Sequence, residues 1–183
     1  MGANWNEGMM RWVPYVDSDG RAYPLSHLHP FRYSLTVSNG CNVEVRVTFA
    51  MHCFTRACQA TDPASQRYQD ERETRSFCPE RYALSPRLPV IARTLANRRC
   101  GYARNDNYVT IDLPATDGGA RHYGVFFNVL RAAMNPGGHA VMLTIQSAYA
   151  LERGRPLPVR GSIHFARLVE LTLQGIKPRP PRA

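Results

Sequence analysis

Lysine is almost missing from this chain, and so are the patterns that would place it at a membrane. Lys177 is the single lysine among the 23 basic residues. No run of eighteen apolar residues occurs, which excludes a membrane-spanning helix. The first residues lack the basic region and apolar block of a secretory signal. We therefore expect a cytoplasmic protein with no membrane partner.

The sequence motifs of several enzyme classes are absent as well. The 5 cysteines form no CxxC pair, and their odd number leaves one unpaired in any disulfide scheme, so we expect reduced thiols. The glycine spacing of a phosphate-binding loop or a dinucleotide fingerprint is missing. The GxSxG element of serine hydrolases is missing too. We expect no cofactor.

Positive charge is present in excess. The formal net charge is +9 and the pI about 9.8, a balance that favours acidic partners. Arginine dominates, and its guanidinium fork can grip phosphate bidentately and stack on bases. The sequence predicts contact with RNA or another polyanion; the alternative is a merely basic surface. The arginines predicted to contact nucleic acid are Arg98, Arg99, Arg121, Arg155 and Arg160.

The chain is predicted to form one domain with two extensions. At 183 residues it can bury a core without a disulfide or a metal. Residues 1–26 are expected to form an irregular N-terminal arm, residues 27–175 a single α+β domain, and residues 176–183 a basic, proline-rich tail.

Alternating apolar residues predict a β-hairpin from residues 31–37 and 43–51. A one-residue slip would turn every side chain to the other face, so the two apolar rows require a loop of odd length, placed at Ser38–Asn42. The resulting pairs are Val37–Val43, Leu35–Val45 and Tyr33–Val47 and, extended further, His29–Met51 and His27–Cys53.

One amphipathic helix is predicted at about residues 86–98, with Ser85 as its N-cap. The preceding residues 55–83 are polar and predict a long connection with room for one short helix. Residues 100–151 are predicted to form four further strands, where an odd loop pairs Val129 with Ile145 and Val125 with Tyr149.

Residues 162–175 fit either a strand or a helix, and their "VELTL" segment favours a strand. The predicted fold class is therefore α+β. It is mainly an antiparallel β-sheet of about six strands in hairpins, with the helix at about residues 86–98 packed on it.

The order of these elements from Ser85 to Leu151, a helix followed by four antiparallel strands, resembles the core of small ribonuclease toxins of the barnase, EndoU and RelE types. This resemblance covers about a third of the chain. No family motif matches, so it implies a fold and no catalytic residue.

Metal-independent RNA cleavage needs a base, an acid and a cation near the phosphate, and histidines with Tyr or Arg can supply all three. The candidate catalytic residues are His29, His52, His122 and Tyr149, which lie near predicted strand ends. The alternative is that they are solvated or core-edge side chains.

Two further hypotheses stay open. The predicted hairpin register brings His27, His29 and Cys53 together, which is compatible with a metal site, although no zinc module has this spacing. Alternatively, the protein is a non-catalytic interaction module that docks on a protein partner through a sheet face or through the aromatic and methionine side chains of its arm. Another interpretation of the arm is that it simply packs on its own domain. The aromatic and methionine side chains of the arm are Trp5, Met9, Met10, Trp12 and Tyr15.

Overall fold

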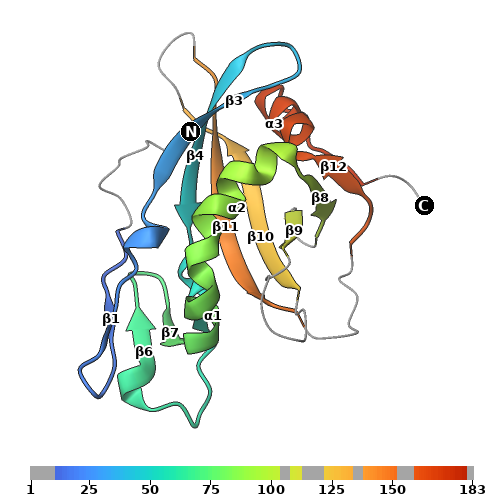
Figure 1. The fold of residues 1–183 in the computed structure, drawn as a ribbon. Coiled ribbons are helices and arrows are strands. Elements are labelled where there is room, and N and C mark those ends of the chain that lie inside the picture. Colours follow the sequence, from blue (N-terminus) through green and yellow to red (C-terminus); the bar gives the residue numbers. More distant parts are fainter. Residues whose placement is uncertain (1–10, 104–107, 113–121, 134–137, 152–158, 181–183) are drawn as a thin grey trace.

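The computed structural model describes residues 11–103, 108–112, 122–133, 138–151 and 159–180. A curved β-sheet forms the centre of the molecule, and a helical segment crosses one of its faces (Figure 1). The strands of this sheet lie in the order β12-β8-β9-β10-β11-β4-β3. Their bounds are β3 Phe31–Thr36, β4 Asn42–Phe49, β8 Arg99–Tyr102, β9 Tyr108–Asp112, β10 Tyr123–Arg131, β11 Ala140–Ala150 and β12 Ser162–His164.

The predicted fold class, a mainly antiparallel α+β domain with one main helical segment packed on the sheet, is confirmed. Two pairings of the main sheet lie outside the predicted hairpins, the antiparallel pair β8–β12 and the pair β4–β11. Strands β4 and β11 run parallel, with Val45 beside Val141 and Val47 beside Leu143. This parallel pair joins the β3–β4 hairpin to the meander of the later strands.

The predicted N-terminal helix boundary at Ser85 is wrong. The helical segment begins seven residues earlier, at Pro79 with Cys78 as its N-cap, and Ser85 lies inside it. Pro86 and Pro89 have no N–H to donate, so 3-10 turns interrupt the α-helix. The segment consists of α1 Pro79–Leu84, η4 Ser85–Arg87, α2 Leu88–Thr94 and η5 Leu95–Asn97.

The inward face of this segment is the predicted one. Leu88, Ile91, Ala92 and Leu95 are all buried against the sheet. Their spacing at i, i+3, i+4 and i+7 forms one apolar stripe on a helix.

The preference for a strand near the C-terminus is also wrong. Strand β12 is short, and the "VELTL" residues belong to the helix α3, Phe165–Leu173. Phe165, Leu168 and Val169 are buried at helical spacing, and the ring of Phe165 packs edge-on against Phe127. Burial of that stripe outweighs the strand propensity of the valine and threonine side chains.

Residues 55–83, predicted as a connection, contain a second, three-stranded sheet in the order β5-β7-β6. Residues 15–53 also contain short elements. The bounds of these elements and of those within residues 55–77 are β1 Tyr15–Val16, β2 Ala22–Tyr23, η1 Ser26–Leu28, η2 Met51–Cys53, β5 Thr55–Arg56, η3 Ala64–Gln66, β6 Arg67–Gln69 and β7 Thr74–Phe77.

The β3–β4 hairpin keeps its apolar residues on one face, but its register differs from the predicted one. Leu35 lies opposite Val43, and the loop is Val37–Cys41, closed by a hydrogen bond from the Val37 N–H to the Cys41 carbonyl. The turn forms one residue earlier because Gly40 takes up a left-handed conformation there, with φ 81°. The odd loop length is retained, so the faces are preserved.

The predicted register of β10 and β11 is wrong as well. Val129 lies opposite Leu143 and Val125 opposite Ala148, with a register shift between Phe126 and Phe127. Such a bulge inserts one residue and reverses the alternation beyond it. Ala148 therefore takes the buried position expected for Tyr149.

Candidate functional site

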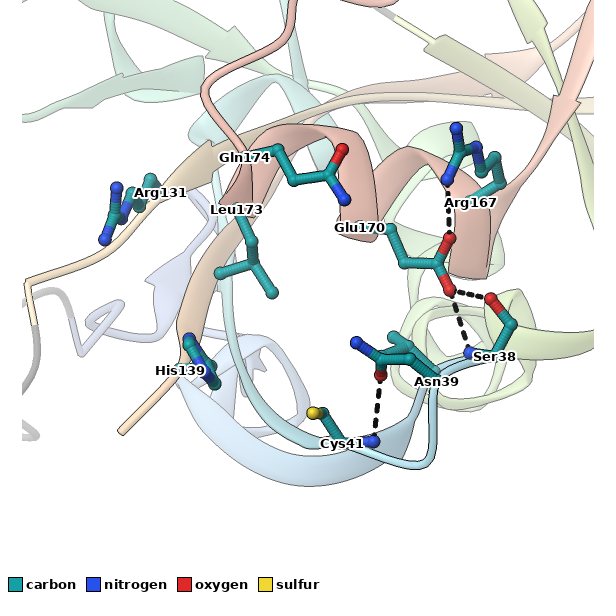
Figure 2. A pocket seen from close by; sticks show the side chains of 10 residues that line it. Ser38, Asn39, Cys41, Arg131, His139, Arg167, Glu170, Leu173 and Gln174 are labelled. Carbon is teal, nitrogen blue, oxygen red and sulfur yellow. Dashed lines mark hydrogen bonds and ion pairs between the residues drawn. The ribbon is translucent and has the colours of Figure 1, made fainter. Parts of the chain in front are cut away.

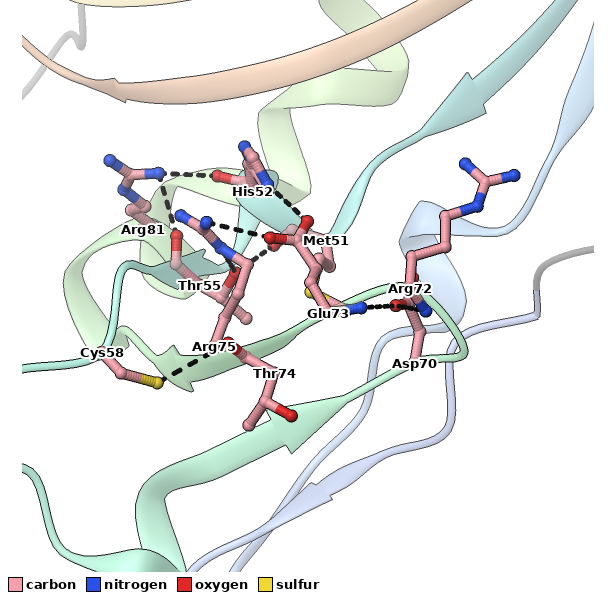
Figure 3. Close-up of polar contacts among 10 residues, drawn as sticks. All are labelled: Met51, His52, Thr55, Cys58, Asp70, Arg72, Glu73, Thr74, Arg75 and Arg81. Carbon is pink, nitrogen blue, oxygen red and sulfur yellow. Dashed lines mark hydrogen bonds and ion pairs between the residues drawn. The ribbon is translucent and has the colours of Figure 1, made fainter.

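Two of the four predicted catalytic residues, His52 and Tyr149, contact the same arginine. Arg81 of α1 donates hydrogen bonds from Nη1 to the carbonyl oxygens of His52 and Thr55, both at 2.9 Å (Figure 3). Its Cζ atom lies 5.0 Å from the centroid of the Tyr149 ring. Tyr149 in turn stacks on Phe126, with ring centroids 5.3 Å apart.

Burial lowers the pKa of Arg81. Among the residues that the structure describes, no carboxylate lies within ion-pair distance of it. The positive charge is instead stabilised by two carbonyl dipoles and the face of an aromatic ring. Arg81 thus holds η2, β5 and β11 together and leaves a cationic group beside His52.

The imidazole of His52 contacts the carboxylate of Glu73 and is partly exposed. Its Nε2 atom lies 2.7 Å from Oε1 of Glu73, whose other oxygen accepts a hydrogen bond from Arg75 at 3.2 Å (Figure 3). Burial alone would raise the pKa of Glu73, but the contacts with His52 and Arg75 together lower it. A carboxylate in this position orients the imidazole through its Nε2 atom.

The other two predicted catalytic residues lie elsewhere. Nε2 of His29 lies 3.4 Å from the carbonyl oxygen of Trp12, just before β3. His122 is exposed at the start of β10, where its carbonyl oxygen accepts a hydrogen bond from the Leu151 N–H. Neither side chain forms a hydrogen bond, ion pair or ring contact with His52, Arg81 or Tyr149, so the four predicted residues do not form one cluster.

The predicted grouping of His27, His29 and Cys53 does not form. His27 contacts Ser85 at 2.6 Å, and the Cys53 thiol points to the carbonyl of Ile145, where burial raises its pKa to about 12. The β3–β4 pairing does not extend to these three residues, so it does not place them opposite one another. No group of three metal-ligating side chains suited to an ion occurs in the described part of the chain.

Three predicted nucleic-acid contacts do gather at one sheet edge. Arg98 and Arg99 line a pocket of about 490 Å³ between β8, β9 and β12, together with Ser162 and Val159. Arg160 follows Val159 and bonds through its N–H to the carbonyl of Tyr102 on β8. Arg121 and Arg155 lie outside the described residues.

Two hydrogen bonds hold the guanidinium of Arg99. Nε donates to Oγ of Ser162 at 3.0 Å and Nη2 to its carbonyl at 3.4 Å. Arg99 and Arg160 are exposed, and neither forms an ion pair with a described carboxylate. This edge therefore presents positive charge that the described part of the protein does not neutralise.

A second pocket, of about 320 Å³, lies between the β3–β4 loop, the ends of β10 and β11, and α3 (Figure 2). Glu170 of α3 forms one wall, where its carboxylate accepts hydrogen bonds from Ser38 and Arg167. Arg131 and His139 line the strand side. This pocket was not predicted, because its residues come from distant parts of the chain.

The described arm residues pack on their own domain. The buried indole of Trp12 donates to the carbonyl of Phe49 at 3.0 Å, and Tyr15 stacks on Phe77 at 4.0 Å between centroids. These two side chains are therefore unavailable to a partner in this structure. Trp5, Met9 and Met10 lie outside the described residues.

Together, the sheet, the helical layer and the two pockets define a mixed α+β protein with an arginine-lined sheet edge. The chain belongs to the YjaZ family, whose model matches residues 14–173. That range includes the whole main sheet and α3. No curated protein matches the chain, and no solved structure matches it either. Within the described residues, no helix is both long and apolar enough to cross a membrane.

Proposed function

We propose that this is a cytoplasmic protein that binds RNA along the β8–β12 edge of its sheet. The observation that carries the proposal is that Arg98 and Arg99 line one pocket, while Arg160 directly follows the pocket residue Val159 and is bonded through its N–H to Tyr102 of β8. A guanidinium held by Ser162, as that of Arg99 is, loses less side-chain entropy on meeting a phosphate. The formal net charge of +9 adds long-range attraction for a polyanion.

Fluorescence anisotropy with a labelled single-stranded RNA, measured over a series of salt concentrations, tests this proposal. Each phosphate contact on a single strand contributes about 0.7 to the slope of log affinity against log salt. An Arg99→Gln, Arg160→Gln double variant should bind more weakly and lose roughly 1.4 from that slope.

Arg32→Gln, Arg67→Gln is the matched control, because it removes the same charge from exposed sites on β3 and β6. The control should keep the wild-type slope. Absence of binding at low salt, or equal slopes in the two double variants, contradicts the proposal.

RNA cleavage is a second candidate, favoured by the contacts of Arg81 with the carbonyl oxygen of His52 and with the ring of Tyr149. His52 would take the proton of the 2′-hydroxyl as its oxygen attacks the phosphorus, Arg81 would stabilise the charge on the phosphate, and Tyr149 would give a proton to the departing 5′-oxygen as its bond to phosphorus breaks. His52→Ala should abolish cleavage of a labelled RNA while the protein stays folded by circular dichroism. His122→Ala, which lies outside the group, should cleave normally. Full cleavage by His52→Ala would refute this candidate.

A further inference from the structure

The pocket of Figure 2 occupies the place where the hydrophobic core ends and inward-facing residues become polar. Side chains two residues apart on a strand share a face. Val129, Val141 and Val43 are buried on the core face. The residues two positions farther toward this end of the sheet are exposed and line the pocket; they are Arg131, His139 and Cys41.

The opposite wall is rigid because its charges are satisfied. Only 9% of the Glu170 side chain is exposed. Its Oε1 atom accepts hydrogen bonds from the N–H and Oγ of Ser38, and its Oε2 atom one from Nη1 of Arg167 at 3.0 Å. Ion pairing with Arg167 neutralises this carboxylate, so it offers little attraction for a cationic ligand.

Arg131 supplies the unbalanced charge of the pocket. It forms no ion pair and no side-chain hydrogen bond with any described residue. His139 follows on the neighbouring strand, where its carbonyl accepts a hydrogen bond from the Glu44 N–H and anchors its backbone. In Figure 2 the Leu173 side chain lies between Arg131 and Glu170. The pocket thus combines a cationic side with an apolar one, formed by Leu173 and Val37.

We propose that this pocket binds a small organic anion, with its phosphate or carboxylate group on Arg131 and His139 and its apolar part against Leu173 and Val37. A volume of about 320 Å³ is at the lower end of the range for small-molecule sites. The pocket is therefore too small for a folded segment of a protein or nucleic acid. The site is separate from the β8–β12 edge and does not depend on RNA binding.

Two exposed cysteines provide a position-specific test. Cys41 lines the pocket, whereas Cys58 lies near β5 and contacts the carbonyl of Thr74. Alkylation by iodoacetamide is followed at each thiol by mass spectrometry, with phenyl phosphate as the anionic probe and phenol as its uncharged counterpart. Phenyl phosphate should slow alkylation of Cys41 at least fivefold and leave Cys58 unchanged. Phenol should slow neither.

Arg131→Gln should abolish the protection of Cys41, and the control Arg32→Gln on the edge strand β3 should retain it. Calorimetric titration with phenyl phosphate measures the affinities of the wild type, Arg131→Gln and Arg32→Gln directly, without relying on thiol reactivity. Arg131→Gln should bind at least tenfold more weakly than the wild type. The proposal is overturned by an unchanged Cys41 rate at millimolar phenyl phosphate, by equal slowing of both thiols, or by an Arg131→Gln protein that binds like the wild type. Because RNA binding is measured with Arg99 and Arg160, failure of one proposal leaves the other standing.

Discussion

Glu170 on α3 accepts two hydrogen bonds from Ser38 in the β3–β4 loop, one from the backbone N–H at 2.8 Å and one from Oγ. The two residues are 132 positions apart in the sequence. The contact ties the last helix to the first hairpin of the main sheet and shapes one wall of the Figure 2 pocket.

Replacement of Glu170 by Ala should lower the free energy of unfolding by about 3 kcal/mol, because it leaves the Ser38 donors without their charged acceptor. Urea denaturation measures the change. Arg167→Gln is the control, since 56% of the Arg167 side chain is exposed, and it should cost about 1 kcal/mol or less. Equal losses in the two variants would show that Ser38 contributes nothing to the effect.

Stability should fall on mild acidification because of His27. Ser85 donates its hydroxyl proton to the carbonyl of Tyr82 at 2.8 Å, so Nε2 of His27 is the donor in the contact with Ser85. Burial, together with the nearby His29, lowers the pKa of His27. The unfolded chain, with a pKa of about 6.5, therefore binds the proton more readily than the folded one.

The contribution of His27 to stability is complete above about pH 6.5 and decreases as the pH falls through that value toward the folded pKa. Urea midpoints at pH 8 and pH 5.5 measure the loss. His27→Gln keeps a donor for Ser85 but cannot titrate, so its midpoint should fall less over this interval. An identical pH dependence in both proteins would assign the effect to other groups.

The cysteines should divide into two classes by reactivity. Burial raises the pKa of the Cys53 and Cys100 thiols to about 12, whereas Cys41 and Cys58 are exposed. At pH 7.5 iodoacetamide should label the buried pair about a thousandfold more slowly, because only the thiolate reacts. In denaturant all four should react alike. Fast labelling of Cys53 in the native protein would contradict its burial under the sheet.

Arg81→Ala should destabilise the protein by about 2–3 kcal/mol, since two carbonyl oxygens lose a charged donor and the Tyr149 ring loses its cation. Arg67→Ala, an exposed change on β6, should cost no more than about 0.5 kcal/mol. Urea denaturation distinguishes them. A cost for Arg81→Ala as small as that of the control would mean that the Arg81 contacts contribute no net stability.

Much of the fold could be predicted because burial imposes a period on the chain. Residues 31–36 and 43–49 alternate, and they form strands with their apolar rows on one face, as predicted. The inward side of the main helix follows from the spacing of Leu88 and Ile91 in the same way. The register of the β3–β4 pair could not be predicted in the same way. A slip of two residues keeps every side chain on the same face, so the hydrophobic pattern cannot distinguish the two registers.

The candidate sites were less predictable. His52 and Tyr149 are connected through Arg81, which contacts both, and no sequence pattern distinguishes Arg81. The bulge at Phe126 and Phe127 turns Tyr149 away from the buried face of β11, and only the residue-by-residue pairing of β10 with β11 shows it. Arg98 and Arg99 were found because a charge at the end of a helix is visible locally.

The sequence by itself determined the α+β class, the faces of the strands and the main helix, and the excess of arginine. Each of these is a local property, since side-chain period and charge can be read within a few residues. Tertiary structure decided the parallel pairing of β4 with β11, the helical state of residues 165–173, and the meeting of Glu170 with Ser38. These three features depend on which distant segments of the chain pack against one another, and the free energy of the whole core determines that packing.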